Sequence, residues 1–169
     1  MTGAAVLASQ FAYKRWANEE LVQLGLASQH LLSADELRLF TRILNHTWVV
    51  DQIFAAHMQG AAHHFGSTNT EDTPTLADLQ ARLARSDAQL EQYVQDLQDA
   101  QLGELIRFRF TDGDTGSMTR SEMLHHLIVH GTYHRGAAGR VLAPHGVALP
   151  RDSLTTFLHR LEPGRRWQA

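Results

Sequence analysis

Apolar residues recur every three to four positions over four long segments of the chain, which is the spacing of the buried face of an α-helix. The first segment covers about residues 4–28, the second about 33–62, the third about 74–100 and the fourth about 119–142. A shorter segment at about 153–161 predicts a fifth, short helix. The third segment is the most amphipathic, and its predicted core residues are Leu76, Leu79, Leu83, Leu90 and Leu97.

Two of these helices have a clear start signal. Ser33 with Glu36, and Thr119 with Glu122, form capping boxes, in which the two side chains bond to free amide groups at the beginning of a helix. Pro144, just past the fourth segment, is a typical stop signal because proline cannot continue the hydrogen-bonding pattern.

Between Gly103 and Ser117 the spacing of apolar residues changes from the helical period to a period of two. The sequence LIRFRF alternates apolar and basic residues, and TDGDTG is rich in turn-forming residues. We expect an extended arm or an irregular hairpin there, and not a sheet. Four long amphipathic helices in 169 residues predict an all-α protein, a four-helix bundle that forms a single domain over residues 1–169.

Composition narrows the function. The formal charge is -3 and no basic stripe is visible, so we expect no nucleic-acid partner. No window approaches the roughly 20 apolar residues that cross a bilayer, and no signal peptide is recognisable, so we expect a cytoplasmic protein with no membrane partner. Cysteine is absent, which leaves His, Asp and Glu as the strong metal ligands and requires any thiol chemistry to use an external thiol.

Four histidines lie within ten residues in HHLIVHGTYHRG, residues 125–136. Residues four apart on a helix share a face, with Cβ atoms about 5–6 Å apart, so two such imidazoles can reach one ion. From His126 to His134 the axial rise is about 12 Å, which is too far for both of these to bind the same ion as His130. Either the pair His126 and His130 or the pair His130 and His134 therefore fits half of a metal site.

A third ligand should come from another helix. His46 lies in ILNHTWVVDQIF, on the apolar stripe of the second predicted helix. A lone histidine there is most often a hydrogen-bonded core residue, but a paired site on another helix favours a ligand. His57 is about 16 Å further along the axis and cannot share an ion with His46. We expect structural or surface roles for His30, His57, His63, His64, His125, His145 and His159.

Three neutral imidazoles around a divalent ion leave at least one coordination position open, which is typical of catalytic zinc sites. Such an ion lowers the pKa of a bound water or thiol. Histidine also suits nickel, iron and copper, so the ligands alone do not identify the metal.

Together, ILNHTWVVDQIF and HHLIVHGTYHRGAAGRVLAPHG resemble the DinB family, also called DinB/YfiT-like metalloenzymes, and the opening FAYKRWANEELV is similar to the first helix of that family. The resemblance implies a four-helix bundle with a long crossover and a short C-terminal helix, frequently a homodimer. It also implies a divalent metal ion, zinc or nickel, held by His46, His130 and His134. The chain departs from the family pattern at Tyr133, where many members have histidine, and at Ala137, where glutamine is common.

The resemblance further implies a thiol-dependent S-transferase or isomerase, because better-characterised relatives use bacillithiol, mycothiol or another low-molecular-weight thiol on a small-molecule substrate. Two alternatives stay open: a hydrolase that uses a metal hydroxide, and a non-catalytic stress-response or ligand-binding module. For the nearby polar residues we favour structural or solvent-exposed roles; these are Asp51, Arg107, Arg109, Tyr133 and Arg135.

Overall fold

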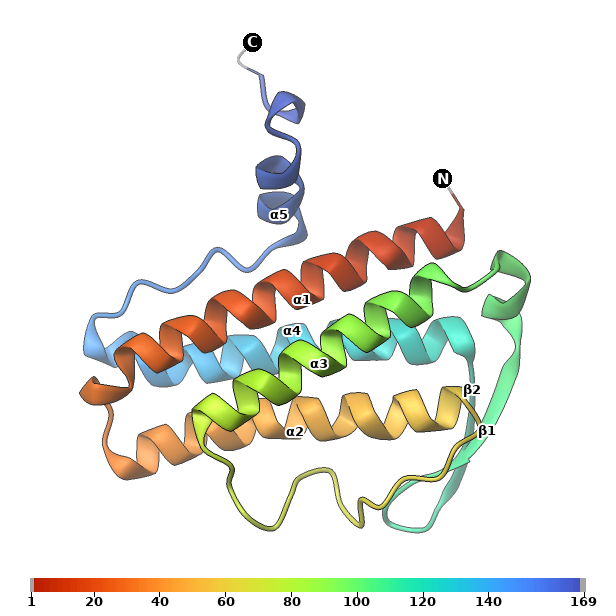
Figure 1. Ribbon diagram of the computed structural model, residues 1–169, viewed down its shortest axis with the longest axis horizontal. Helices are drawn as coiled ribbons and strands as arrows, with labels where there is room; N and C mark the ends of the chain where they lie inside the picture. The colour runs from red at the N-terminus through yellow and green to blue at the C-terminus, as the bar shows by residue number, and fades with distance from the viewer. Residues whose placement is uncertain (1, 168–169) are drawn as a thin grey trace.

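The computed structural model describes residues 2–167 and is an all-α helical bundle. In Figure 1, α2 and α3 run in the same direction and are joined by a long crossover, whereas α1 and α4 run the opposite way. α1 packs mainly on α3, and α2 on α4. The bundle predicted from the apolar pattern is therefore confirmed. Its helices are α1 (Gly3–Ser28), α2 (Ala34–Met58), α3 (Leu76–Gln95), α4 (Arg120–Leu142) and α5 (Leu154–Leu161).

The helix starts follow the capping residues of the sequence. Both predicted capping boxes are present, at Ser33 for α2 and at Thr119 for α4. The predicted end of the second helix was wrong, because α2 stops at Met58, about four residues early. Gly60 adopts a left-handed φ of 65°, and the Ala61 amide donates to the carbonyl of Ala56, so the chain turns out of the helix in a Schellman motif.

The third predicted helix is also shorter than expected, since α3 ends at Gln95 and a 3-10 turn follows at Asp99–Gly103. The five leucines predicted to form the core are all buried, as Leu76, Leu79, Leu83, Leu90 and Leu97. No helix within residues 2–167 combines the length and the apolar character needed to span a bilayer.

The connection from α3 to α4 contains a hairpin, one of the two alternatives expected there, but it is regular and forms a two-stranded sheet, which corrects the expectation that no sheet would form. β1 (Leu105–Arg109) pairs antiparallel with β2 (Thr115–Thr119), with Leu105 opposite Thr119. The alternation in LIRFRF explains this regularity: Phe108 is buried against the bundle, while the arginines on either side of it are exposed.

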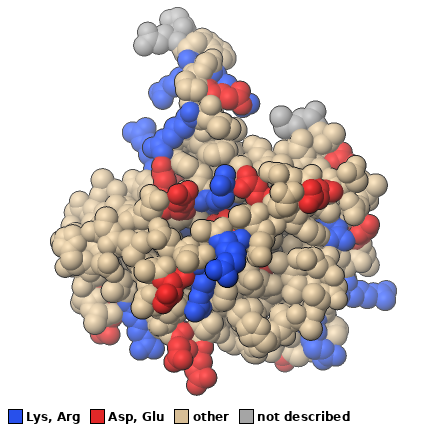
Figure 2. All heavy atoms as spheres, viewed as in Figure 1, with Lys and Arg blue, Asp and Glu red and all other residues tan. Residues whose placement is uncertain are grey.

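Charged side chains of both signs are mixed on the face of the molecule shown in Figure 2, and no continuous basic area crosses the bundle on that face. α5 projects away from the four long helices (Figure 1). It is tied to α1 through Phe157, whose ring lies 5.7 Å from that of Trp16.

Candidate metal centre

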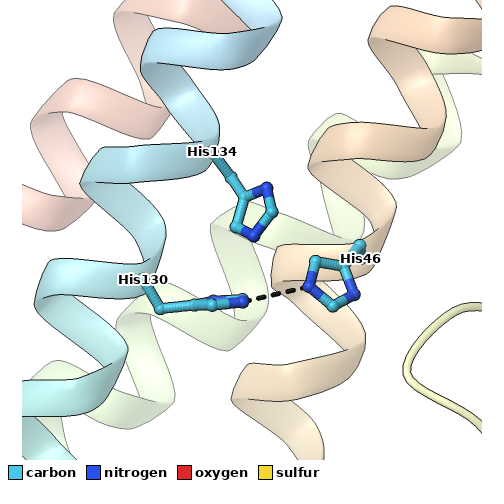
Figure 3. A group of neighbouring side chains, drawn as sticks. All are labelled: His46, His130 and His134. Atoms are coloured by element: carbon cyan, nitrogen blue, oxygen red, sulfur yellow. Dashed lines mark hydrogen bonds between the residues drawn. The ribbon is translucent and has the colours of Figure 1, made fainter.

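Three histidines from two helices meet at the contact between α2 and α4. His46 comes from α2, and His130 and His134 from successive turns of α4; one ring nitrogen of each lies within 4.8 Å of one of each of the others. Figure 3 shows the imidazoles of α4 directed toward His46 across the interface. The Nε2 atoms of His46 and His130 are 3.0 Å apart. The spacing and the resemblance therefore selected residues that the fold does bring together.

Of the two histidine pairs that the spacing allowed on α4, only the C-terminal pair joins His46. His126 lies outside the cluster, and its ring is stacked on that of His130 at a centroid distance of 5.1 Å. All three clustered rings are partly exposed, so the centre is accessible from solvent.

The crossover between α2 and α3 fixes the orientation of His46. The Nδ1 atom of His46 is 2.6 Å from the carbonyl oxygen of Thr68, which can only accept, so Nδ1 carries the proton of this hydrogen bond. The neighbouring Asn69 holds this part of the crossover against α2, since its side-chain amide donates to the Arg42 carbonyl at 3.0 Å. A hydrogen bond from the second imidazole nitrogen to a carbonyl is the usual way in which proteins orient a histidine ligand.

The donor set fits a divalent transition-metal ion. With the Nδ1 proton directed at Thr68, the Nε2 of His46 faces His130. Two imidazole nitrogens bound to one tetrahedral zinc ion, each at about 2.0–2.1 Å, lie about 3.3 Å apart, which is close to the observed separation. Without a cation, the same two nitrogens can share a hydrogen bond when His130 carries its proton on Nε2.

Electrostatics keep the histidines of α4 uncharged. Burial, reinforced by the neighbouring His134 and His46, lowers the pKa of His130 to about 3. Burial and His46 also lower the pKa of His134. Both imidazoles are therefore neutral near pH 7, which is the form that binds metal ions.

A family model now decides the relationship, because the model of the DinB family matches residues 9–165. The chain belongs to the DinB family. Its structure is similar to the crystal structure of a DinB-like protein from Bacillus cereus, with a TM-score of 0.64 and 16% sequence identity. The match covers 85% of this chain and 93% of the other, and at this identity it supports the fold alone. A search of curated proteins found no match.

The polar residues near the DinB centre have the structural or exposed positions that we favoured. Asp51 and Arg135 are buried in ion pairs. Tyr133 is 73% exposed, although its ring lies 5.1 Å from that of His134. Arg107 and Arg109 are exposed on the hairpin.

The remaining histidines lie apart from the centre. Several make local contacts: His145 with Glu36, and His57 with His63, whose rings are 5.0 Å apart. His125 is exposed, and its Nδ1 bonds to the carbonyl of Ser121 one turn earlier.

Sequence reasoning missed a buried ion network behind the centre of this DinB chain. Lys14 of α1 donates from Nζ to Asp51 of α2 and to Asp87 of α3, both at 2.7 Å. Asn18 donates to the other oxygen of Asp87 at 2.8 Å and accepts from Arg135 of α4 at 3.1 Å. We call these five residues the buried ion network. A signal was present, because Lys14 and Asn18 lie on the apolar stripe of the first helix.

Proposed function

We propose that this DinB chain binds one divalent transition-metal ion through His46, His130 and His134 and uses it in catalysis. The observation that carries the proposal is the approach of imidazole nitrogens from two helices, with His46 Nε2 and His130 Nε2 at 3.0 Å. These nitrogens can offer lone pairs to a cation, and the buried Nδ1 of His130 has no hydrogen-bond partner among residues 2–167.

Three protein ligands and partial exposure favour a catalytic role over a structural one. Structural zinc sites usually have four protein ligands and are closed, whereas catalytic sites keep a position for water or substrate. When bound, the ion would supply positive charge that lowers the pKa of a thiol or a water molecule. The chain itself would orient His46 through Thr68.

We further propose that the activity is a thiol-dependent S-transfer or isomerisation of a small molecule. Two considerations support this form. The resemblance described in the sequence analysis implies a thiol-dependent activity, and the chain has no cysteine, so a reacting thiol would come from a low-molecular-weight cofactor. Zinc and nickel are the metals that we expect. The homodimer and the cytoplasmic location remain predictions.

Metal content tests the first proposal. Wild type and the variants His46→Ala, His130→Ala and His134→Ala would be supplied with zinc or nickel, desalted and analysed by plasma mass spectrometry. We expect about one ion per chain in the wild type and a loss of most of it in each variant, because two imidazoles remain. Circular dichroism would check that the helices persist.

His125→Ala is the matched control, since His125 lies on the same helix but is exposed and bonded to Ser121. It should retain the metal. A folded wild type that takes up no metal, or a control that loses it as fully as the ligand variants, would contradict the proposal.

Turnover assays distinguish the thiol-dependent transferase from the hydrolase and from a non-catalytic module. The metal-loaded protein would be assayed with an electrophilic chromogenic probe in the presence of bacillithiol, mycothiol or glutathione, and with a nitrophenyl ester in the absence of thiol. Probe conjugation that requires both metal and thiol supports the transferase. Ester hydrolysis alone supports the hydrolase, and no turnover in either assay favours a ligand-binding module.

A further inference from the structure

Three rings from α2 and α4 form a stack that ends at a proposed metal ligand. The phenyl ring of Phe54 lies against the imidazole of His126 at a centroid distance of 4.7 Å and an interplanar angle of 15°. His126 lies in turn against His130 at 5.1 Å and 24°. The other two ligands meet His130 edge-on, His46 at 62° and His134 at 63°. One face of His130 is therefore covered by a nearly parallel ring.

His130 lacks the hydrogen bond that orients His46. The Nδ1 of His46 is held by the Thr68 carbonyl, whereas the Nδ1 of His130 is buried and has no partner among residues 2–167. The bond between Cβ and the ring has a broad torsional minimum, so the Nδ1 side of the ring, which has no hydrogen bond, is oriented by its packing. The stacked face therefore adds to the Nε2 contact with His46 in restricting rotation of the His130 ring.

We propose that His126 is a positioning residue: it binds no metal, and its flat ring holds the His130 imidazole with Nε2 directed at the centre. This inference rests on the proposed metal site. Phe54 supports the other face of His126, and its ring lies 6.1 Å from that of Phe108 on β1. Through this contact the hairpin completes the packing that aligns a ligand on α4.

Two substitutions of His126 distinguish a role of its flat ring from a role of its ring nitrogens. His126→Phe keeps an aromatic face and removes both nitrogens, and His126→Leu removes the flat face at similar volume. Cobalt(II) titration followed by visible absorption would report both affinity and ligand geometry. We expect His126→Phe to bind within about threefold of wild type. His126→Leu should bind about 10- to 100-fold more weakly, with an altered cobalt spectrum, as is usual when the support of a ligand is lost.

The metal-free protein gives a second readout. Nuclear magnetic resonance signals of the His130 ring protons, identified by their loss in His130→Ala, should be shifted upfield by the neighbouring ring in wild type and His126→Phe. They should return downfield in His126→Leu. If His126→Leu does not fold, Phe54→Leu removes the other side of the stack and should weaken cobalt binding in the same direction.

The outcomes separate this inference from the metal proposal. A wild type that binds no cobalt but shows the ring-proton contrast contradicts the metal site and leaves the positioning intact. Equal cobalt binding and spectra in wild type and His126→Leu overturn the positioning role. If His126→Phe loses cobalt as fully as His126→Leu, a nitrogen of His126 is required, and the role proposed for its flat ring is wrong.

Discussion

Two polar clusters of the bundle, the buried ion network and the three-histidine centre, differ in how their groups are satisfied. In the buried ion network, Lys14 meets a carboxylate oxygen of both Asp51 and Asp87, and the amide of Asn18 joins Asp87 to Arg135. At the centre formed by His46, His130 and His134, two imidazole nitrogens face each other at 3.0 Å, and the buried Nδ1 of His130 has no partner in the part of the chain that the structure describes.

The difference indicates the role of each cluster. Buried charges with matched partners are satisfied within the protein, so the network is complete as it stands. The histidine centre is not complete in this sense, because the buried Nδ1 of His130 has no partner among residues 2–167, and the lowered pKa of His130 keeps its ring uncharged. The network is therefore expected to stabilise the fold, and the centre to bind a ligand.

The largest expected effect comes from breaking the network. Lys14→Met should lower the free energy of unfolding by about 3–5 kcal/mol, because it leaves the buried carboxylates of Asp51 and Asp87 without their cation. Urea unfolding at pH 7, followed by circular dichroism, would measure this loss.

The neighbouring exposed pair is the control. Arg15→Met breaks the ion pair with Glu91, in which the arginine side chain is 52% exposed, and should cost less than about 1 kcal/mol. Equal stability of Lys14→Met and wild type would contradict a stabilising role for the network.

A smaller effect is expected in how the free energy of unfolding depends on pH. Burial, opposed by Lys14 and helped by Asp87, raises the pKa of Asp51 from 3.8 to about 6. The folded protein therefore holds a proton that the unfolded chain releases, so the stabilisation from this group is complete below about pH 4 and is lost as the pH rises through about 6.

The variant Asp51→Asn cannot titrate at this position, so its difference from wild type gives the contribution of the Asp51 carboxyl group. The unfolding free energy of wild type relative to Asp51→Asn should fall by about 2–3 kcal/mol between pH 4 and pH 7. Urea unfolding of both proteins at the two pH values would measure it. A relative stability that rises with pH would mean that the attraction of Lys14 outweighs burial.

The smallest effect is expected at the centre when metal is absent. In chelator-treated protein, His46→Ala should lower the unfolding free energy by about 1–2 kcal/mol, since the partly exposed ring loses its hydrogen bonds to Thr68 and His130.

Adding metal should then make the wild type more stable than His46→Ala. At a free metal concentration 100 times the Kd, the wild type should gain about 2.7 kcal/mol, and His46→Ala should gain much less. Thermal and urea unfolding would follow both states. A metal-free His46→Ala as unstable as Lys14→Met would identify His46 as a packing residue.

Local signals in the sequence predicted the helix starts and the residues that meet at the centre. The capping boxes at Ser33 and Thr119 involve side chains only three residues apart, so they can be recognised without the fold. The four-residue spacing of His130 and His134 is equally local. The choice of His46 needed more, because an apolar stripe alone does not reveal its partner; the resemblance to DinB proteins provided it.

Features that depend on distant segments were missed. The Thr68 carbonyl reaches His46 only because the crossover folds back along α2, and no motif in the sequence encodes this contact. The partners of Lys14 lie 37 and 73 positions away, so its place on an apolar stripe indicated burial without naming the carboxylates. The hairpin became regular because Phe108 has the bundle to pack against.

The order of the helices also determines when the centre can form. His46 and His130 are 84 positions apart, and the helix that carries two of the three ligands is the last long helix of the chain. Contacts over such separations form after local ones because their loop-closure entropy is larger. During synthesis, α1 to α3 emerge before α4, so a metal ion held by all three histidines would be loaded after the bundle is complete and would not guide its early folding.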